Sequence, residues 1–218
     1  ASGSVTEITC FGLTNGAIDL TVTGGSSSYT YSWNTNPVQT TQDLTGLAAG
    51  TYTVTITESN SCAITGTVAY TVAAAPAVLD ASSTQTNVLC NGASTGAIDL
   101  TVTGGTTPYG YSWSNGTSVV STDADPTGLP EGTYTCTVTD ARLCTTTEVV
   151  SITQSAVVAA SGVVTPITCF GETDGAINLS VTGGSGSYTY SWSNGTSVVA
   201  TTQDLTGLAA GTYTVTIT

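Results

Sequence analysis

Apolar and polar residues alternate in short stretches along the whole chain. An apolar residue stands at every second position of residues 18–23 and again of residues 51–57, where the intervening positions are mostly threonine. A period of two places successive side chains on opposite faces of a β-strand. Branched threonine fits the pleat while its hydroxyl stays hydrated, so these stretches predict half-buried strands with threonine on the solvent side. No stretch has helical spacing.

The alternation returns twice, because the chain contains three copies of one pattern. The copies are marked by Cys10, Cys90 and Cys169, which lie about 80 residues apart, the size of a small domain. Each cysteine is followed by Gly-Ala-Ile, Gly-Gly, Tyr-Ser-Trp and Gly-Thr-Tyr. With about six or seven short strands per copy, the pattern predicts an all-β tandem array of three immunoglobulin-like antiparallel sandwich domains, the third incomplete. The expected domains are residues 1–75, 76–156 and 157–218.

Aromatic residues form a stripe in each copy, for example Tyr29, Tyr31 and Trp33, which share one face of the predicted strand. The opposite face carries Ser and Thr, and the copy has no other Trp for its centre. We therefore expect the stripe to be core, although an exposed sugar-stacking platform is the alternative.

Two further stretches bear on turns and linkers. Asn115-Gly116 and Asn194-Gly195 follow the tryptophan strands and predict type I′ hairpin turns. The linker around residues 73–76 is short and has no Gly/Ser tract, so we expect neighbouring domains to abut in a rigid rod.

The charge balance excludes several function classes. Arg142 is the only basic residue, Lys and His are absent, and 14 acidic residues give a net charge of −13. Such a polyanion cannot neutralise phosphates, so neither nucleic acid nor an anionic membrane surface is an expected partner. Without His or Lys there is no Ser-His-Asp triad, histidine metal site or Schiff base, and we expect no enzyme. No stretch approaches the ~20 apolar residues that a membrane helix needs.

The six cysteines indicate an oxidising compartment. The interval from Cys10 to Cys62 nearly equals that from Cys90 to Cys144, and the two intervals occupy equivalent places in their copies. We therefore expect the disulfides Cys10–Cys62 and Cys90–Cys144, each closing a loop worth about 4 kcal/mol of chain entropy. No CxxC pair supports a zinc site.

The other two cysteines have no predicted bond. Cys136 stands where the other copies have Val54 and Val215, so it is expected to be a small buried hydrophobe. Cys169 has no partner before the sequence ends.

Acidic and amide residues recur at matching positions, and we expect no cofactor from them. Oxygen ligands for calcium are the alternative, but no consecutive calcium loop occurs, and Asp also favours turns for its own reasons. The residues concerned are Asp19, Asp43, Asp99, Asp123, Asp125, Asn178 and Asp204.

These landmarks carry a resemblance. The order Cys-(Phe/Asn)-Gly, Gly-Ala-Ile, Val-Thr-Gly-Gly, Tyr-Ser-Trp and Gly-Thr-Tyr-Thr resembles the SprB-type repeat of very large gliding adhesins of Bacteroidetes, and it spans all three copies. The Trp-Ser-Asn-Gly stretch also resembles the PKD-like branch of immunoglobulin folds. The resemblance implies type IX export, display at the cell surface and a filamentous adhesive role.

We accordingly expect a structural, adhesive segment of a long extracellular filament at the cell surface, in which copies of the repeat contact one another. The alternatives are carbohydrate-binding accessory modules that contact surface polysaccharide in a large secreted protein, or a subunit of a self-assembling fibre.

The sequence stops at Thr218, which matches Thr57, so we expect a slice of a longer array. Without a final strand, the third copy would leave Val215 and Ile217 beside an open sheet edge. Such an edge could accept a strand from another chain.

Overall fold

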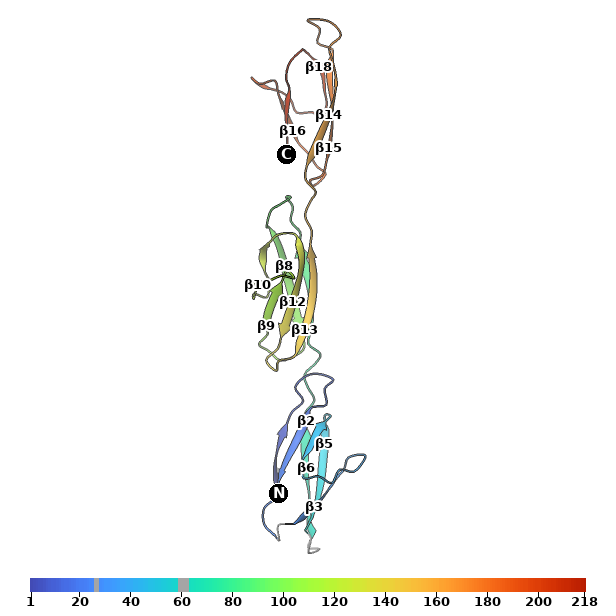
Figure 1. The fold of residues 1–218 in the computed structure, drawn as a ribbon, viewed down its shortest axis with the longest axis vertical. Helices are drawn as coiled ribbons and strands as arrows, with labels where there is room; N and C mark the ends of the chain where they lie inside the picture. The colour runs from blue at the N-terminus through green and yellow to red at the C-terminus, as the bar shows by residue number, and fades with distance from the viewer. Residues whose placement is uncertain (26–27, 59–62) are drawn as a thin grey trace. The chain divides into compact units, whose positions relative to one another are not determined.

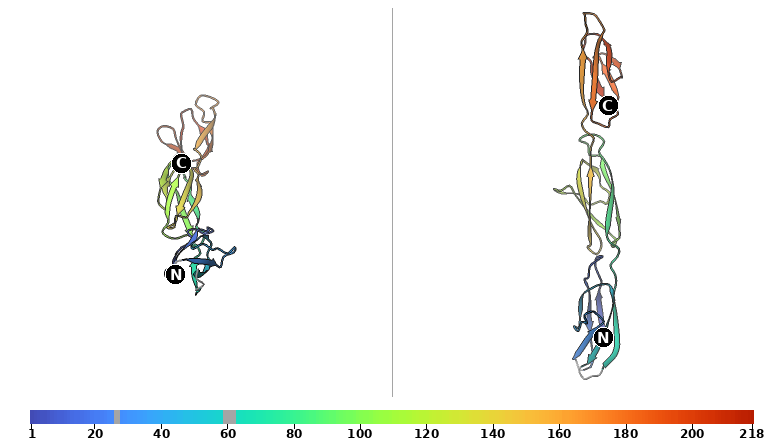
Figure 2. Two further views of the ribbon diagram at one scale, coloured as in Figure 1. Left: turned by 60° about the horizontal axis from the view of Figure 1, so that its bottom comes forward. Right: turned by 90° about the vertical axis from the view of Figure 1, so that its right-hand side faces the viewer.

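Every regular element in the described residues is a β-strand. The computed structural model describes residues 1–25, 28–58 and 63–218, with residues 63–66 described by their backbone alone. Figures 1 and 2 show the chain as strands joined by loops. Below, "first", "middle" and "last repeat" denote residues 1–75, 76–156 and 157–218.

The first repeat forms two antiparallel three-stranded sheets, with strand orders β1-β2-β4 and β3-β5-β6. Its strands are β1 (Ser2–Thr6), β2 (Gly16–Thr21), β3 (Tyr29–Trp33), β4 (Leu44–Leu47), β5 (Gly50–Glu58) and β6 (Ala63–Val72).

The middle repeat has the same plan with one extra strand, in the orders β11-β8-β7 and β10-β9-β12-β13. Its strands are β7 (Asp80–Thr86), β8 (Gly96–Thr103), β9 (Gly110–Ser114), β10 (Val119–Ser121), β11 (Thr127–Leu129), β12 (Gly132–Thr139) and β13 (Thr145–Ile152).

The last repeat follows this plan without a counterpart of β6 or β13 among the described strands, in the orders β14-β15-β18 and β17-β16-β19. Its strands are β14 (Ala159–Thr165), β15 (Gly175–Thr182), β16 (Tyr190–Ser193), β17 (Val198–Ala200), β18 (Leu205–Leu208) and β19 (Thr214–Ile217). In every repeat the second strand lies between the first strand and a later one, and the remaining strands form the second sheet. This is the strand arrangement of an immunoglobulin-like sandwich, as predicted.

Contacts divide the chain into two compact units that do not follow the predicted domains. One unit comprises Ala1–Thr84, Asp99–Asp125 and Tyr134–Val150, and the other comprises Gln85–Ile98, Pro126–Thr133 and Ser151–Thr218. The expected domain boundaries near residues 75 and 156 therefore stay predictions.

The alternating apolar residues form the cores. In the first repeat Ile18 and Leu20 from one sheet pack with Trp33, Val54 and Ile56 from the other, each at most 1% exposed. The two sheets are therefore joined by the residues whose alternation predicted them.

The tryptophans are core residues, as the sequence interpretation favoured. Trp33, Trp113 and Trp192 are at most 3% exposed. Each indole N–H donates to a backbone carbonyl oxygen, at 2.9, 3.1 and 3.0 Å respectively. Because a buried indole needs such an acceptor, the same contact in all three repeats fixes the ring inside the sandwich. Cys136 is likewise fully buried, and burial raises the pKa of its thiol.

The Asn-Gly hairpins form, but with a different turn. β9 and β10 are joined by residues 115–118, and the Asn115 side-chain oxygen accepts the N–H groups of Thr117 and Ser118 at 3.1 and 3.0 Å. A type I′ turn needs positive φ at both central residues. Gly116 has positive φ, whereas Asn115 does not. The prediction of a type I′ turn was therefore wrong, because the Asn side chain organises a longer loop by hydrogen bonding.

Candidate functional site

A buried carboxylate organises the loop between β12 and β13. Asp140 is 4% exposed and accepts the backbone N–H groups of Arg142 and Cys144, both at 2.8 Å. Its second oxygen accepts the N–H of Thr106 at 2.9 Å. Leu143 completes the turn with a φ of 66°, in the left-handed region. The loop is therefore held in one shape that presents the residues on either side of Leu143.

The hydrogen bonds also set the ionisation of this carboxylate. Burial raises the pKa of Asp140. The hydrogen bonds from the N–H groups of Cys144, Thr106 and Arg142, together with the positive charge of Arg142, lower this pKa by more than burial raises it. The net effect is a pKa below the ordinary value, so the group is charged at neutral pH. The anion, rather than the acid, organises the turn.

The turn contacts the segment after β1 through a covalent bond. Cys144 forms a disulfide with Cys10, across a sequence separation of 134 residues, with a Cα–Cα distance of 5.7 Å. Arg142 donates from Nη1 to the carbonyl oxygen of Ile8 at 2.9 Å. The only basic side chain of the protein therefore reinforces the bond that joins the first repeat to the middle repeat.

The expected pairs Cys10–Cys62 and Cys90–Cys144 were wrong, because Cys10 and Cys144 are bonded to each other. Cys90 is a free, exposed thiol, and Cys62 lies outside the described residues.

Strand β13 is the physical reason why Cys90 and Cys144 do not pair. Cys144 directly precedes this strand. The loop of Cys90 is instead bonded past the strand's other end, because Gly92 donates its N–H to Gln154 Oε1 at 2.6 Å. Eight extended residues span roughly 26 Å, far more than the reach of a disulfide.

The segment that enters the middle repeat is held by its Gly-Gly turn. The N–H of Gly105 donates to the carbonyl oxygen of Ala77 at 2.9 Å. A Cβ placed on Gly104 would lie 1.8 Å from the carbonyl oxygen of Val78, so the backbones approach as closely as only glycine allows.

The Gly-Gly turn of the last repeat makes the same contact. Gly184 donates to the Ala156 carbonyl oxygen at 2.8 Å, and a Cβ on Gly183 would lie 2.0 Å from the oxygen of Val157. The repeated Gly-Gly pair therefore binds the incoming backbone.

These features meet at one place in the first compact unit. A small cavity of about 10 Å³ is lined by Cys10, Cys144 and Asp140, together with Ala77 and Gly105. A space of this size holds at most one water molecule, so the side chains around it are packed against each other. We call this group the junction cluster; it comprises Ile8, Cys10, Ala77, Gly105, Asp140, Arg142 and Cys144.

Three of the carboxylates considered for calcium have the same kind of structural partner. Asp43, Asp125 and Asp204 each accept one backbone N–H at 2.9 Å. The donors are the N–H groups of Leu20, Leu100 and Leu179. In the described part of the chain, no three His, Cys, Asp or Glu side chains are grouped as metal ligands. The recurring Asp residues therefore tie a loop to the second strand of each sandwich, and calcium binding stays an untested alternative.

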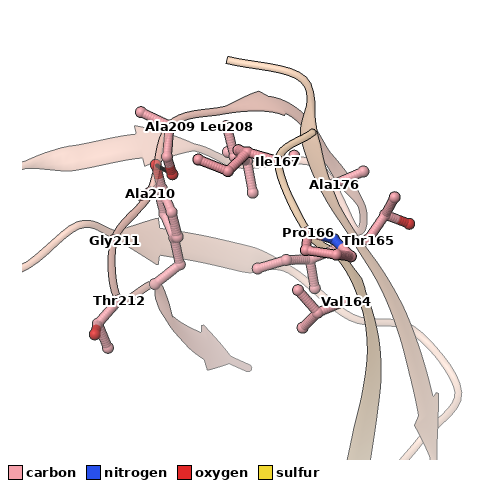
Figure 3. A pocket seen from close by; sticks show the side chains of 13 residues that line it. Val164, Thr165, Pro166, Ile167, Ala176, Leu208, Ala209, Ala210, Gly211 and Thr212 are labelled. Carbon is pink, nitrogen blue, oxygen red and sulfur yellow. Dashed lines mark hydrogen bonds between the residues drawn. The ribbon is translucent and has the colours of Figure 1, made fainter. Parts of the chain in front are cut away.

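An apolar groove of about 460 Å³ lies in the last repeat (Figure 3). Pro166, Ile167 and Leu208 are among the side chains that surround it. Two other repeats show what fills the equivalent place, because a Cβ on Gly16 would meet Val72 at 2.7 Å and one on Gly96 would meet Ile152 at 2.9 Å. These are residues of β6 and β13, so the groove has the shape of a binding site for one further strand.

The sequence interpretation missed the junction cluster. Two signals could have indicated it. Arg142 is the single cation of the protein, and it lies two residues before a cysteine and two after an acidic residue. Asp140 precedes Cys144 by four residues, as Glu58 precedes Cys62.

Several solved structures resemble the chain at low sequence identity. The three N-terminal domains of the bacteriophage RB49 Highly Immunogenic Outer Capsid protein share 19% identity over 88% of this chain and 75% of that one, with a TM-score of 0.44. The I67–I69 fragment of titin shares 10% identity over 95% of this chain and 88% of that one, with a TM-score of 0.38. A C-terminal fragment of intimin shares 17% over 72% and 66%, also with a TM-score of 0.38.

Sequence comparison is more specific. No curated protein matches the chain. Among the described residues there is no helix with the length and apolarity to cross a bilayer. The profile of the SprB repeat matches three times, at residues 2–38, 82–118 and 161–197, which together make up half of the chain. The chain therefore belongs to the SprB repeat family, whose repeats occur in cell-surface proteins.

Proposed function

We propose that this chain is a load-bearing, adhesive segment of a long extracellular filament, in which successive repeats are joined covalently. The observation that carries the proposal is the disulfide between Cys10 and Cys144. A bond between repeats changes how tension passes through the chain.

The effect on tension follows from connectivity. When the two ends are pulled apart, the shortest covalent path runs from residue 1 to Cys10, crosses the sulfur–sulfur bond to Cys144 and continues to residue 218. Residues 11–143 lie outside that path and cannot be extended while the bond holds. The chain thus keeps most of its first two repeats protected from mechanical unfolding.

The surface of the repeats supports an adhesive role. Charged residues are 7% of the chain, and the outward positions of the strands are mostly Thr and Ser. Hydroxyl groups exchange hydrogen bonds with water and with hydrated surfaces at small net cost, so single contacts are weak. Many repeats in one filament would multiply such contacts into firm attachment.

The tryptophans give no support to the carbohydrate-binding alternative. Stacking on a sugar ring needs an exposed aromatic face, whereas all three Trp rings are buried. Surface polysaccharide remains a proposed contact of the hydroxyl-rich strands. Repeats of this family are typically structural rather than catalytic, and the chain lacks the His and Lys on which most acid-base chemistry would rely.

Retention under flow tests the adhesive role. Beads coated with the oxidised chain should stay on glass and on polysaccharide-coated surfaces at higher shear than beads coated with an unrelated acidic tandem of immunoglobulin domains. The cysteine variant Cys90→Ser serves as a matched control that leaves the Cys10–Cys144 bond intact. Detachment at the same shear as the unrelated tandem would contradict the proposal.

A further inference from the structure

We propose that Cys90 and Cys169 each form the kind of disulfide that Cys10 forms with Cys144. Their partner in each case is the cysteine of a turn like Asp140–Cys144 in the repeat that follows. Every junction between successive repeats would then be closed by one disulfide. The inference rests on the geometry of the cysteine loops and holds whether or not the filament is adhesive.

The three cysteine loops have the same backbone shape. In each, the cysteine carbonyl oxygen accepts the N–H three residues later, from Leu13, Ala93 or Glu172, at 3.1 Å. The glycine two residues after each cysteine has positive φ, at 80°, 76° and 87°. Positive φ at the third position is the mark of a type II turn. All three thiols are therefore presented by the same turn.

The two free loops are accessible. Cys90 and Cys169 are exposed, unbonded thiols. The side chain after Cys169, Phe170, is fully exposed, whereas its counterpart Phe11 is 62% exposed and lines the cavity beside Cys144. A fully exposed Phe is uncommon on a solvated surface. Phe170 is therefore fully exposed at the free Cys169 loop, whereas its counterpart Phe11 is partly covered at the bonded Cys10 junction.

The acidic side of the junction recurs as well. In the middle repeat a Cβ on Gly105 would lie 3.0 Å from Asp140 Oδ2, and in the first repeat a Cβ on Gly25 would lie 2.6 Å from Glu58 Oε1. The Gly-Gly turns of the first and middle repeats therefore both lie against the acidic residue that stands four positions before a cysteine. The acidic contact is shared by these two repeats rather than a peculiarity of Asp140.

Pairing within one repeat is excluded by the position of the loops. The Cys90 loop is bonded to residues past the end of β13, since Asn91 Nδ2 donates to the Ser155 carbonyl oxygen at 3.2 Å and Gly92 to Gln154. The cysteine of the Asp140 turn stands before the start of that strand. A repeat with its two cysteines at opposite ends can form bonds with its neighbours only.

The reaction is ordinary thiol–disulfide exchange with an external disulfide donor such as oxidised glutathione. The Cys90 thiolate attacks one sulfur of the donor, and the donor's other sulfur leaves as a thiolate. The partner cysteine then attacks the Cys90 sulfur and displaces the second donor sulfur, so the two protein thiols are oxidised to a disulfide. The donor is reduced to two thiols, which take up the two protons that the protein thiols lose. Extracellular compartments supply such donors.

An extended chain tests the proposal directly. Thr218 matches Thr139 in the repeat, so a copy of residues 140–152 placed after Thr218 completes the last repeat and adds one cysteine. After refolding with oxidised glutathione, peptide mapping under non-reducing conditions should find the added cysteine bonded to Cys90, with Cys10–Cys144 unchanged. A bond from the added cysteine to Cys169, or an added cysteine that stays free, would overturn the inference.

Two variants keep the result interpretable. In the extended chain, Cys90→Ser should leave the added cysteine open to alkylation, whereas Cys169→Ser should leave the new bond in place. Equal alkylation in both variants contradicts the proposal. If the extension does not fold, Trp192 fluorescence will not match that of the parent chain, and a fusion that continues into a complete fourth repeat then carries the same test to Cys169.

Discussion

Pulling on single molecules would measure how much chain the Cys10–Cys144 bond protects. With the bond intact, the stretch between the two cysteines, a sequence separation of 134, cannot be extended. An extended residue contributes about 3.3–3.6 Å, so complete unfolding of the reduced chain should exceed that of the oxidised chain by about 440–480 Å. Force–extension curves of the chain tethered at its ends, with and without a thiol reductant, give this difference as a change in contour length.

Matched cysteine variants separate this bond from pairing within the repeats. Cys144→Ser should lengthen the oxidised chain to the reduced length, and Cys62→Ser should change nothing. If Cys10 were instead paired with Cys62 and Cys90 with Cys144, the protected length would be about 350–380 Å. The variant Cys62→Ser would then release about half of it. Such a release, or equal lengths with and without reductant, would refute the covalent junction.

Three further predictions concern the junction and the groove. Gly104→Ala should destabilise the protein by more than the about 1–2 kcal/mol that an L side chain costs at positive φ, because its Cβ would meet backbone. Gly24→Ala should cost only that amount, because among the described residues no atom lies within 4 Å of its Cβ. Urea unfolding of both variants measures the difference. Because its pKa is lowered on folding, Asp140 should stabilise the protein above about pH 3.9 and lose this effect as the pH falls through its folded value. Asp140→Asn should therefore make the urea midpoint depend less on pH below about pH 3.9, and an unchanged profile would contradict the role of the anion. A synthetic peptide of residues 140–152 should bind the apolar groove and reduce quenching of Tyr213 fluorescence by acrylamide, while a scrambled peptide should not.

The fold could be predicted because the alternation of apolar and polar residues shows which face of each strand is buried. Ile18 and Leu20 alternate with polar residues, and both are buried as the period of two requires. Trp33 could be assigned to the core because its strand carries only Ser and Thr on the other face. In each case the information lies within a few residues, so the sequence alone is sufficient.

The disulfide could not be predicted from spacing, because the repeated pattern offers Cys144 two partners. These are Cys90 in its own repeat and Cys10 in the preceding repeat, and spacing alone favours the nearer one. The choice depends on which end of the sandwich each loop occupies. That is decided by hydrogen bonds such as Gly92 to Gln154, between residues 62 positions apart. The Asp140 turn was missed for a similar reason, since a buried carboxylate bound by three N–H groups looks like any turn Asp in sequence.

The placement of the cysteines has a consequence for an array of such repeats. A bond within one domain stabilises that domain and leaves the linkers to carry the full tension. If Cys90 forms the proposed bond, tension would enter the middle repeat at Cys144 and leave it at Cys90, so it would pass through the sandwich beside β13. The incoming backbone at Ala77, already bound by Gly105, would then be relieved of load. A filament built in this way resists extension at its junctions, where tandem domains joined by linkers alone would yield first.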